Sequence, residues 1–180
     1  MKGIVFAEFL QFIENSYGYK QVDSIIESAD LSTDGSYTSV GSYPFTEMVS
    51  LLVESSRITK KSHSELLRLF GHHLFKVFLD GYRQFFEGVE SSFEIFSTLE
   101  SKIHPDVRKL YPDAELPRFE VEKMNDRSMI LVYRSSRKMS DFALGLIEAC
   151  MEHFDEQGII QSQKLDPDGE VVRFVIKRGA

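Results

Sequence analysis

Residues 103–119 read Ile-His-Pro-Asp-Val-Arg-Lys-Leu-Tyr-Pro-Asp-Ala-Glu-Leu-Pro-Arg-Phe, and the pattern of the chain changes within them. Up to about Tyr111, apolar residues recur at spacings of three and four, as they do on one face of a helix. From Arg118 onward, apolar and polar residues alternate, which is typical of a half-buried strand. These residues therefore divide a helical first part of the chain from a second part that contains a sheet.

Helices are predicted throughout the first part. A Ser-His-Ser-Glu capping box at residues 62–65 begins a long helix. Its apolar positions cover more than one stripe, so we expect it to be buried on two sides. Residues 30–44 are rich in Ser, Gly, Thr and Asp and predict a loop. The other helical patterns cover residues 3–17, 20–29, 44–55 and 91–111.

Two hairpins are predicted in the second part, with turn signals at Asn125-Asp126 and at Asp166-Pro-Asp-Gly169. The predicted elements are strands at 118–124, 128–133, 159–165 and 170–177, with a helix at 138–155 between the hairpins. We therefore predict an α+β fold in a single domain, residues 1–180. A helical N-terminal subdomain, about residues 1–60, would pack on a C-terminal subdomain, about 61–180, that has helices and a four-stranded antiparallel sheet.

The composition indicates a soluble globular protein and argues against several other classes. Hydrophobic residues make up 42% of the 180, and a formal net charge of −7 disfavours nucleic acid or anionic lipid as a partner. No apolar run reaches the length of a membrane span, and Glu8 and Glu14 interrupt the one that resembles a signal peptide. The single cysteine, Cys150, excludes an internal disulfide and a cysteine-built metal site within one chain. We expect a cytoplasmic protein.

The aromatic content is unusual, with fifteen Phe and seven Tyr but no Trp. A Phe-rich core is one interpretation. The other is a wall of flat side chains around a large, flat, apolar ligand.

One of the five histidines, His104, borders an apolar stripe of the helical pattern. It is either a buried histidine satisfied by its neighbours or a ligand. Because a proline disfavours helical geometry in the residue before it, Pro105 predicts a kink or a helix start near His104. The other four have structural or solvent-facing explanations, at helix ends (His63, His153) or on diverging faces of one helix (His72, His73).

Tyr133, Ser135 and Arg137 occupy alternate positions at the end of a predicted strand. If the strand persists, their phenol, hydroxyl and guanidinium groups point the same way. Convergent donors with one fixed positive charge suit a pair of carboxylates. Taken alone, a solvated strand end is the simpler explanation of the triplet.

Taken in order, several short motifs make the sequence resemble the haem nitric oxide/oxygen-binding (H-NOX) family, which includes the sensor domain of soluble guanylate cyclase. The resemblance runs essentially end to end and is greatest for the stand-alone bacterial form. The most specific motif is residues 103–119, followed at the expected distance by the Tyr/Ser/Arg triplet. The others are Met1-Lys-Gly3, Phe9, Tyr37-Thr-Ser-Val-Gly41, Tyr43-Pro44, Phe70-Gly71 and Gly145-Leu-Ile-Glu148.

This resemblance implies a bound haem b, anchored by the C-terminal subdomain. By position, His104 would be the axial iron ligand, and Tyr133, Ser135 and Arg137 would hold the haem propionates. Pro117 corresponds to the proline that pushes the porphyrin out of plane. A neutral imidazole is a good proximal ligand, and a rigid ring suits the distortion of a macrocycle.

The resemblance also implies which gas binds on the distal side of the haem. Oxygen-binding members offer a tyrosine hydroxyl to O2 at the position of Phe142. Bound O2 carries partial negative charge and gains from a donor, whereas NO and CO need one much less. The sequence therefore favours NO and CO over O2. The implied distal residues are all apolar: Val5, Phe9, Leu74, Phe78, Phe142 and Leu146.

The expected function is that of a gas sensor and not of an enzyme. As the resemblance implies, NO would weaken the bond between iron and His104, and the two subdomains would then rotate relative to each other. The signal would pass to a separate partner, such as a histidine kinase or a cyclic-di-nucleotide enzyme. The alternatives are an O2-binding member and a cofactor-free adaptor of the same fold. A peroxidase or oxygenase would need a distal acid–base group or a thiolate ligand, and the distal positions offer neither.

Overall fold

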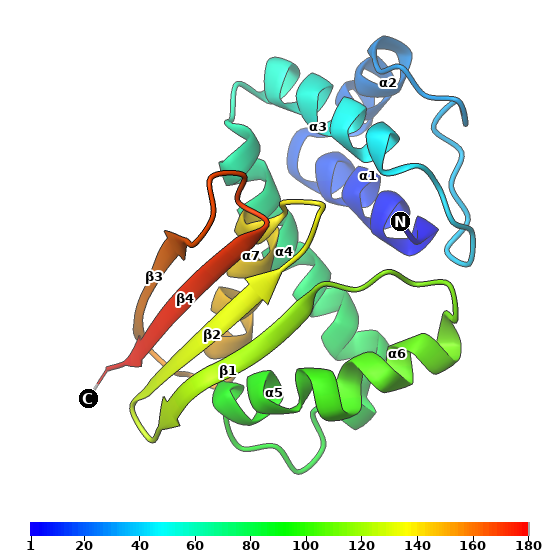
Figure 1. Ribbon diagram of the computed structural model, residues 1–180. Helices are drawn as coiled ribbons and strands as arrows, with labels where there is room; N and C mark the ends of the chain where they lie inside the picture. Colours follow the sequence, from blue (N-terminus) through cyan, green and yellow to red (C-terminus); the bar gives the residue numbers. More distant parts are fainter. Residues whose placement is uncertain (180) are drawn as a thin grey trace.

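The computed structural model describes residues 1–179 and contains a sheet, two long helices beside it and a group of helices at the N-terminal end (Figure 1). The strands are β1 (Arg118–Asn125), β2 (Ser128–Arg134), β3 (Gly158–Lys164) and β4 (Val171–Arg178). They lie in the order β1-β2-β4-β3, and all neighbouring pairs are antiparallel. The predicted α+β class and the four-stranded antiparallel sheet are confirmed.

The helices fall into three groups (Figure 1). The N-terminal group is α1 (Gly3–Tyr17), α2 (Tyr19–Ser28) and α3 (Phe45–Thr59). The long helices α4 (His63–Gly81) and α7 (Ser140–His153) pack along one another, and α7 lies on the sheet. The segment that leads to β1 holds a 3-10 turn (Arg83–Phe85), α5 (Ser92–Thr98), the π-helical turn η2 (Leu99–Ile103) and α6 (His104–Leu110).

The helical stretch predicted over residues 91–111 is therefore interrupted. At its centre the His104 N–H donates to the Leu99 carbonyl, one residue farther back than in an α-helix. A new helix, α6, then begins at His104 with Pro105 in its first turn, where a missing N–H costs nothing. The predicted helix start near His104 is confirmed, and His104 is helical although a proline disfavours that geometry in the residue before it. That residue has φ −61° and ψ −38°.

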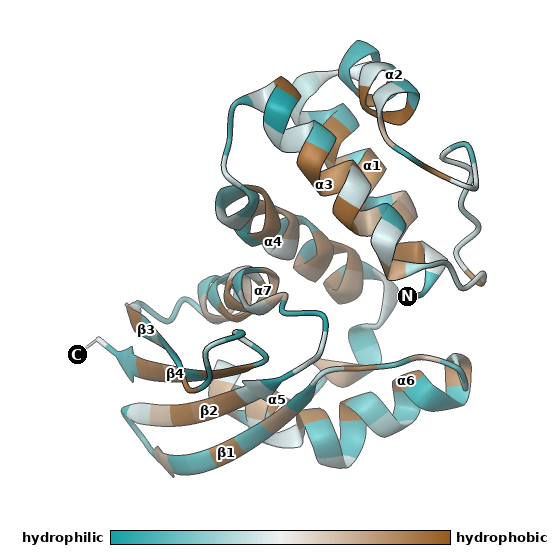
Figure 2. Ribbon diagram, turned by 45° about the horizontal axis from the view of Figure 1, so that its top comes forward, coloured by the Kyte–Doolittle hydropathy of each residue, from teal (hydrophilic) through white to brown (hydrophobic). Residues whose placement is uncertain are grey.

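Two hydrophobic clusters form the core, and Figure 2 shows the apolar residues along the strands and helices that supply them. The sheet cluster joins one face of the sheet to α7. Its members from β2, β4 and α7 are Met129, Leu131, Tyr133, Val172, Phe174, Ile176, Ala143, Ile147, Ala149, Cys150 and Met151. The N-terminal cluster has the buried members Phe6, Phe9, Phe12, Ile13, Val22, Ile25, Met48, Leu51, Leu66, Phe70 and Leu74.

Helix α4 contributes to both clusters, as its apolar pattern predicted. Leu66, Phe70 and Leu74 belong to the N-terminal cluster, while Phe75 belongs to the sheet cluster. The helix begins with the predicted capping box, in which the Ser62 side chain accepts from the backbone N–H three residues on. The N-terminal cluster therefore extends beyond residue 60 into α4. The division into two subdomains near residue 60 stays a prediction.

Glycines allow α4 and α7 to approach closely. Gly71 of α4 faces the backbone of α7 at the Phe142 carbonyl, and Gly145 of α7 faces the Arg68 carbonyl of α4. A Cβ at either glycine would overlap those backbone atoms. Small residues at both points therefore set the distance between the two helices.

We expect Gly145→Ala to lower the free energy of unfolding by about 1–3 kcal/mol, because the new methyl group forces the two backbones apart. Urea unfolding followed by circular dichroism measures this loss. The matched control is Gly81→Ala at the end of α4, where a Cβ meets nothing within 4 Å. That change is expected to be neutral or slightly stabilising. Equal effects of the two substitutions would contradict the proposed close packing.

A buried carboxylate, Glu47 of α3, organises the loop between α2 and α3. It accepts hydrogen bonds from the hydroxyls of Ser32 (2.5 Å), Thr33 (2.6 Å) and Tyr37 (2.7 Å). Burial raises the pKa of the Glu47 carboxyl, but these hydrogen bonds outweigh it and leave the pKa below its ordinary value. The predicted loop is thus ordered by one charged side chain that stays ionised.

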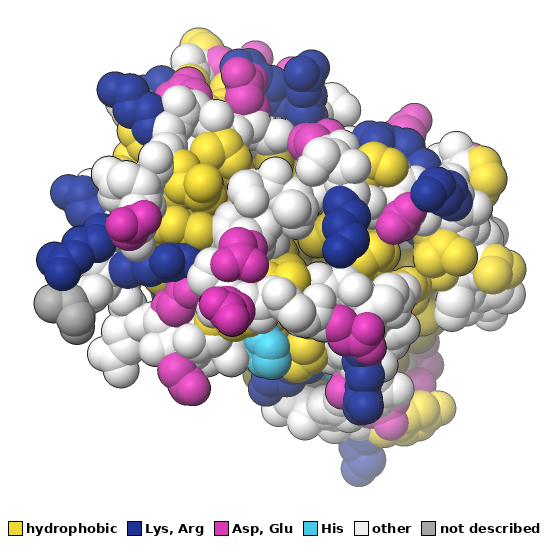
Figure 3. Space-filling view, turned by 90° about the horizontal axis from the view of Figure 1, so that it is seen from below, with side chains coloured by type: hydrophobic (Ala, Val, Ile, Leu, Met, Phe, Trp, Pro, Cys, Tyr) yellow, Lys and Arg dark blue, Asp and Glu magenta, His cyan; other side chains and the backbone are white. Residues whose placement is uncertain are grey.

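The surface carries charges of both signs. On the face seen in Figure 3, Lys and Arg side chains are interspersed with Asp and Glu, and apolar side chains lie between them. A single-sign patch of the kind that binds nucleic acid does not form on that face. Within residues 1–179, no helix is both long enough and apolar enough to cross a membrane.

Candidate functional site

His104, the first residue of α6, is 8% exposed. Its Nδ1 lies 2.8 Å from Oε1 of Glu100, which sits one turn earlier. A carboxylate oxygen accepts hydrogen bonds, so this contact favours the neutral tautomer in which Nδ1 carries the proton and Nε2 keeps its lone pair. Burial lowers the pKa of His104, although Glu100 opposes that shift, so the neutral imidazole is favoured. A neutral imidazole with Nε2 unprotonated is the form that binds a metal.

The same Glu100 oxygen joins the helical segment to the sheet. Oε1 also accepts from the backbone N–H of Phe119 in β1, at 2.9 Å. The Phe119 ring lies between two expected site residues, with its centroid 6.1 Å from that of His104 and 5.6 Å from that of Tyr133. Pro117, also partly buried, stands two residues before Phe119 at the entrance to β1. The structure therefore gathers His104, Pro117 and Tyr133 around one strand end.

The Tyr133/Ser135/Arg137 triplet converges by a different route from the one that alternation predicts. Strand β2 ends at Arg134, close to the predicted end at Tyr133, so the condition of a persisting strand is not met and Ser135 and Arg137 lie in the turn that follows. The Ser135 hydroxyl accepts from the Arg137 N–H at 3.2 Å and thereby closes the turn. Tyr133 is 2% exposed, and its hydroxyl accepts from the Met139 N–H at 3.1 Å. Burial raises the pKa of Tyr133, so its hydroxyl stays protonated.

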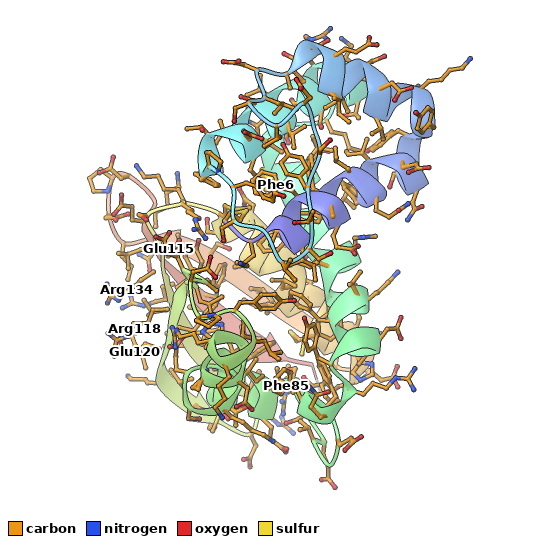
Figure 4. All side chains as sticks on the ribbon, turned by 90° about the vertical axis from the view of Figure 1, so that its right-hand side faces the viewer. Phe6, Phe85, Glu115, Arg118, Glu120 and Arg134 are labelled. Carbon is orange, nitrogen blue, oxygen red and sulfur yellow. The ribbon has the colours of Figure 1, made fainter. Side chains whose placement is uncertain are left out.

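Arg137 already binds a carboxylate in this structure. Its guanidinium donates to the Glu115 side chain at 2.7 Å and to the Glu115 carbonyl at 2.8 Å. The Glu115 side chain is 85% exposed, whereas that of Arg137 is 17% exposed. In Figure 4, Glu115 lies on the loop before β1, while Arg118, Glu120 and Arg134 point outward from the sheet. Arg137 is therefore a partly buried cation, and the carboxylate that binds it lies on the solvent-exposed side.

A hollow of about 400 Å³ opens beside Arg137. Its lining comes from α3, from the first part of α4 and from residues 136–141, and it includes Phe45, whose ring lies 5.9 Å from the guanidinium carbon of Arg137. His104 is not among the lining residues. The hollow thus belongs to the Arg137 end of the site.

The six expected distal residues lie in one place. Phe9 and Leu74 are buried members of the N-terminal cluster, and the remaining four pack against it: Val5, Phe78, Phe142 and Leu146. They come from α1, α4 and α7. Phe142 stacks on Phe70 with centroids 5.1 Å apart. The structure thus brings these apolar side chains together, and their role stays a prediction.

Sequence reasoning missed two of the residues that shape the site. Glu100 stands four residues before His104, a spacing that places two side chains on one helix face, and that signal could have identified it. Glu115 carries no such signal, because its contact with Arg137 joins residues 22 positions apart.

The other histidines make ordinary contacts. His72 reaches Glu148 of α7, whereas His73 reaches Glu8 of α1, so the two face different helices as predicted. In the part of the chain that the structure describes, no three His, Cys, Asp or Glu side chains are placed to hold a metal ion. A haem iron needs only one such ligand from the protein.

Comparison with known proteins agrees with this geometry. The Haem-NO-binding family matches residues 2–162, and the chain belongs to that family. It is therefore an H-NOX domain, of a family whose description implies a haem iron. Among curated proteins, none matches it.

Solved structures of bacterial H-NOX proteins are similar over their full length. The A71G mutant of the protein from K. algicida, in its unliganded Fe(II) form, is 41% identical, with a TM-score of 0.96 and coverage of 100% of this chain and 97% of that one. The Fe(II)CO form from Shewanella woodyi, bound to IWP-051, is 37% identical, with a TM-score of 0.84 and coverage of 99% and 95%. The Fe(II)NO form from S. oneidensis is 20% identical over both whole chains, and its TM-score of 0.90 shows a shared fold.

The residues present fit a haem. His104 offers a neutral imidazole nitrogen, Arg137 offers a guanidinium for carboxylates, and the apolar group from α1, α4 and α7 offers the non-polar surface that a porphyrin requires. Tyr133 and Ser135 stand beside Arg137, so they would share the contact with the propionates.

We expect Arg137→Gln to speed the transfer of haem to an acceptor protein by at least about tenfold, because one charge-assisted hydrogen bond contributes roughly 1.5–3 kcal/mol. Stopped-flow absorbance with excess apomyoglobin measures the rate. The matched control is Arg134→Gln, which removes an outward-pointing arginine of the same turn region (Figure 4). If both variants lose haem at the wild-type rate, Arg137 does not hold it.

Proposed function

We propose that this chain is a ferrous-haem sensor that binds NO, and also CO, and does not bind O2 stably. The observation that carries the proposal is the contact of Nδ1 of the buried His104 with the Glu100 carboxylate at 2.8 Å, which leaves Nε2 free to bind a metal. A bound haem would supply an iron atom able to bind a diatomic gas, and His104 would be its protein ligand. The chain's own residues hold the haem, choose the gas and transmit the result.

The choice of gas depends on the distal group, which carries no hydrogen-bond donor at its six expected positions. The tyrosines that pack against the N-terminal cluster direct their hydroxyls elsewhere. The hydroxyl of Tyr37 bonds to Glu47 and that of Tyr43 to Thr38. Tyr17 ends α1, eight residues and therefore about 12 Å beyond Phe9. These contacts support NO and CO as ligands over O2, and the relatives solved with CO and NO support them further.

Transmission depends on what α6 is attached to. The loop after α6 is held to the N-terminal part of the chain by Asp113, which accepts from Lys2 Nζ at 3.0 Å and from the Ser42 hydroxyl. Release of His104 from iron would free the start of α6, and this loop would pass the displacement to α1 and to the loop before α3. A ligand shifts such an equilibrium only by its preference for one state, and the lost histidine bond provides that preference.

Three further parts of the proposal follow from the residues and the family resemblance. The family resemblance implies haem b, and the single cysteine of the chain argues against covalent c-type attachment, which needs two cysteines. The buried free thiol of Cys150 suits a reducing, cytoplasmic compartment. The signal passes to a separate histidine kinase or cyclic-di-nucleotide enzyme, and the domain itself is not an enzyme.

Expression with haem supplied tests the ligand assignment. Wild-type protein should show a strong haem absorption band, and His104→Gly should show it only when imidazole is added to replace the missing side chain. The control is His153→Gln, an exposed histidine at the end of α7 that should leave the spectrum unchanged. Wild-type protein without a haem band would favour the cofactor-free adaptor. An unaltered spectrum of His104→Gly without imidazole would remove His104 as the ligand.

The distal assignment predicts that one hydroxyl group alters the choice of gas. Ferrous wild-type protein should change its spectrum with CO and NO but not reversibly with O2, whereas Phe142→Tyr should add a reversible change with O2. Phe142→Leu is the control for the loss of stacking on Phe70. A reversible response of the wild type to O2 would favour the alternative, an O2-binding member of the family.

A further inference from the structure

Glu100 occupies an unusual position for an acidic residue, because a single carboxylate oxygen bonds to groups on two different elements, α6 and β1. Oε1 lies 2.8 Å from Nδ1 of His104 and 2.9 Å from the backbone nitrogen of Phe119. The side chain of Glu100 is 33% exposed and that of His104 is 10% exposed, so the bond lies at the edge of the interior and is partly shielded from water. No other side chain within the described residues is hydrogen-bonded to the His104 ring.

We propose that Glu100 is a positioning residue that holds His104 in the Nδ1–H tautomer and strengthens its bond to iron. The inference rests on the proposed haem ligation by His104. A carboxylate that accepts from Nδ1–H draws the proton partly away from the ring and raises the basicity of Nε2. The resulting ligand is a stronger donor than an imidazole that is hydrogen-bonded to a neutral carbonyl.

The proposal has a consequence for sensing, because NO must weaken the bond that Glu100 strengthens. A stronger iron–histidine bond opposes the release of His104 and so raises the concentration of NO needed to displace it. A stronger donor also stabilises Fe(III) relative to Fe(II) and lowers the reduction potential. Glu100 therefore sets the sensitivity of the protein and does not touch the gas.

The second hydrogen bond gives the carboxylate its fixed place. Phe119 belongs to β1, so the hydrogen bond from its N–H fixes Oε1 relative to the sheet. The turn η2 and helix α6 fix the position of His104. The π-helical turn η2 places Glu100 and His104 on the same side despite the break in the α-helix. Two independent elements thus define the carboxylate–imidazole geometry.

The test compares Glu100→Gln, Glu100→Ala and wild-type protein. Gln keeps an oxygen that accepts both hydrogen bonds but removes the charge, so it separates donor strength from packing. We expect the iron–histidine stretching frequency, measured by resonance Raman spectroscopy of the ferrous protein, to fall from wild type to Gln to Ala. The reduction potential should rise in the same order, and displacement of His104 by NO should become roughly tenfold faster in Ala.

The matched control is Glu120→Gln, which removes the same charge one residue beyond Phe119, where the side chain points outward (Figure 4). It should leave the stretching frequency and the potential at their wild-type values. If Glu100→Gln also leaves both unchanged, the proposal is overturned, even though wild-type protein binds haem. Wild-type protein without haem would instead overturn the proposed function.

A measurement on haem-free protein tests the positioning role independently. Nitrogen NMR of the His104 ring should show Nδ1 protonated in the wild type and a mixture of the two neutral tautomers in Glu100→Ala. Far-UV circular dichroism of the same samples reports whether the variants remain folded. The same tautomer populations in both folded proteins would overturn the proposal without any reference to haem.

Discussion

The close contact between α4 and α7 is the constraint on which the rest of the structure depends. Gly71 and Gly145 let the two backbones approach to a distance that a side chain would forbid. Because α4 lends residues to both hydrophobic clusters, this contact fixes the N-terminal helices relative to the sheet. Leu146 of α7 packs against both clusters, so the same pair of helices also joins the apolar group to the sheet.

The sequence predicts those parts of the fold that local signals determine. The capping box at Ser62 and the turn at Asp166 each satisfy backbone groups within a few residues, so both are readable without tertiary context. The π-helical turn at residues 99–103 is not readable in this way. The turn accompanies the hydrogen bonds of Glu100 to His104 and to Phe119, and the second of these joins residues 19 positions apart.

The candidate site shows the same distinction. His104 and the Tyr/Ser/Arg triplet were found through the family pattern, whereas their convergence depends on how the chain turns after Arg134. Alternation along a strand gave the wrong physical reason for that convergence, because a turn closed by Ser135 replaces the strand. Glu115 could not be found from the sequence, since it reaches Arg137 only through the packing of the loop before β1.

The link made by Lys2, Ser42 and Asp113 has a consequence for the environment in which the protein works. The Asp113 side chain is 59% exposed, so ions in solution screen its attraction to Lys2. Burial protects the core contacts from that screening. The mechanical connection between α6 and the N-terminal helices therefore loosens as ionic strength rises, while the fold itself is unaffected. In the proposed function, the coupling between α6 and the N-terminal helices would therefore depend on the salt content of the surroundings.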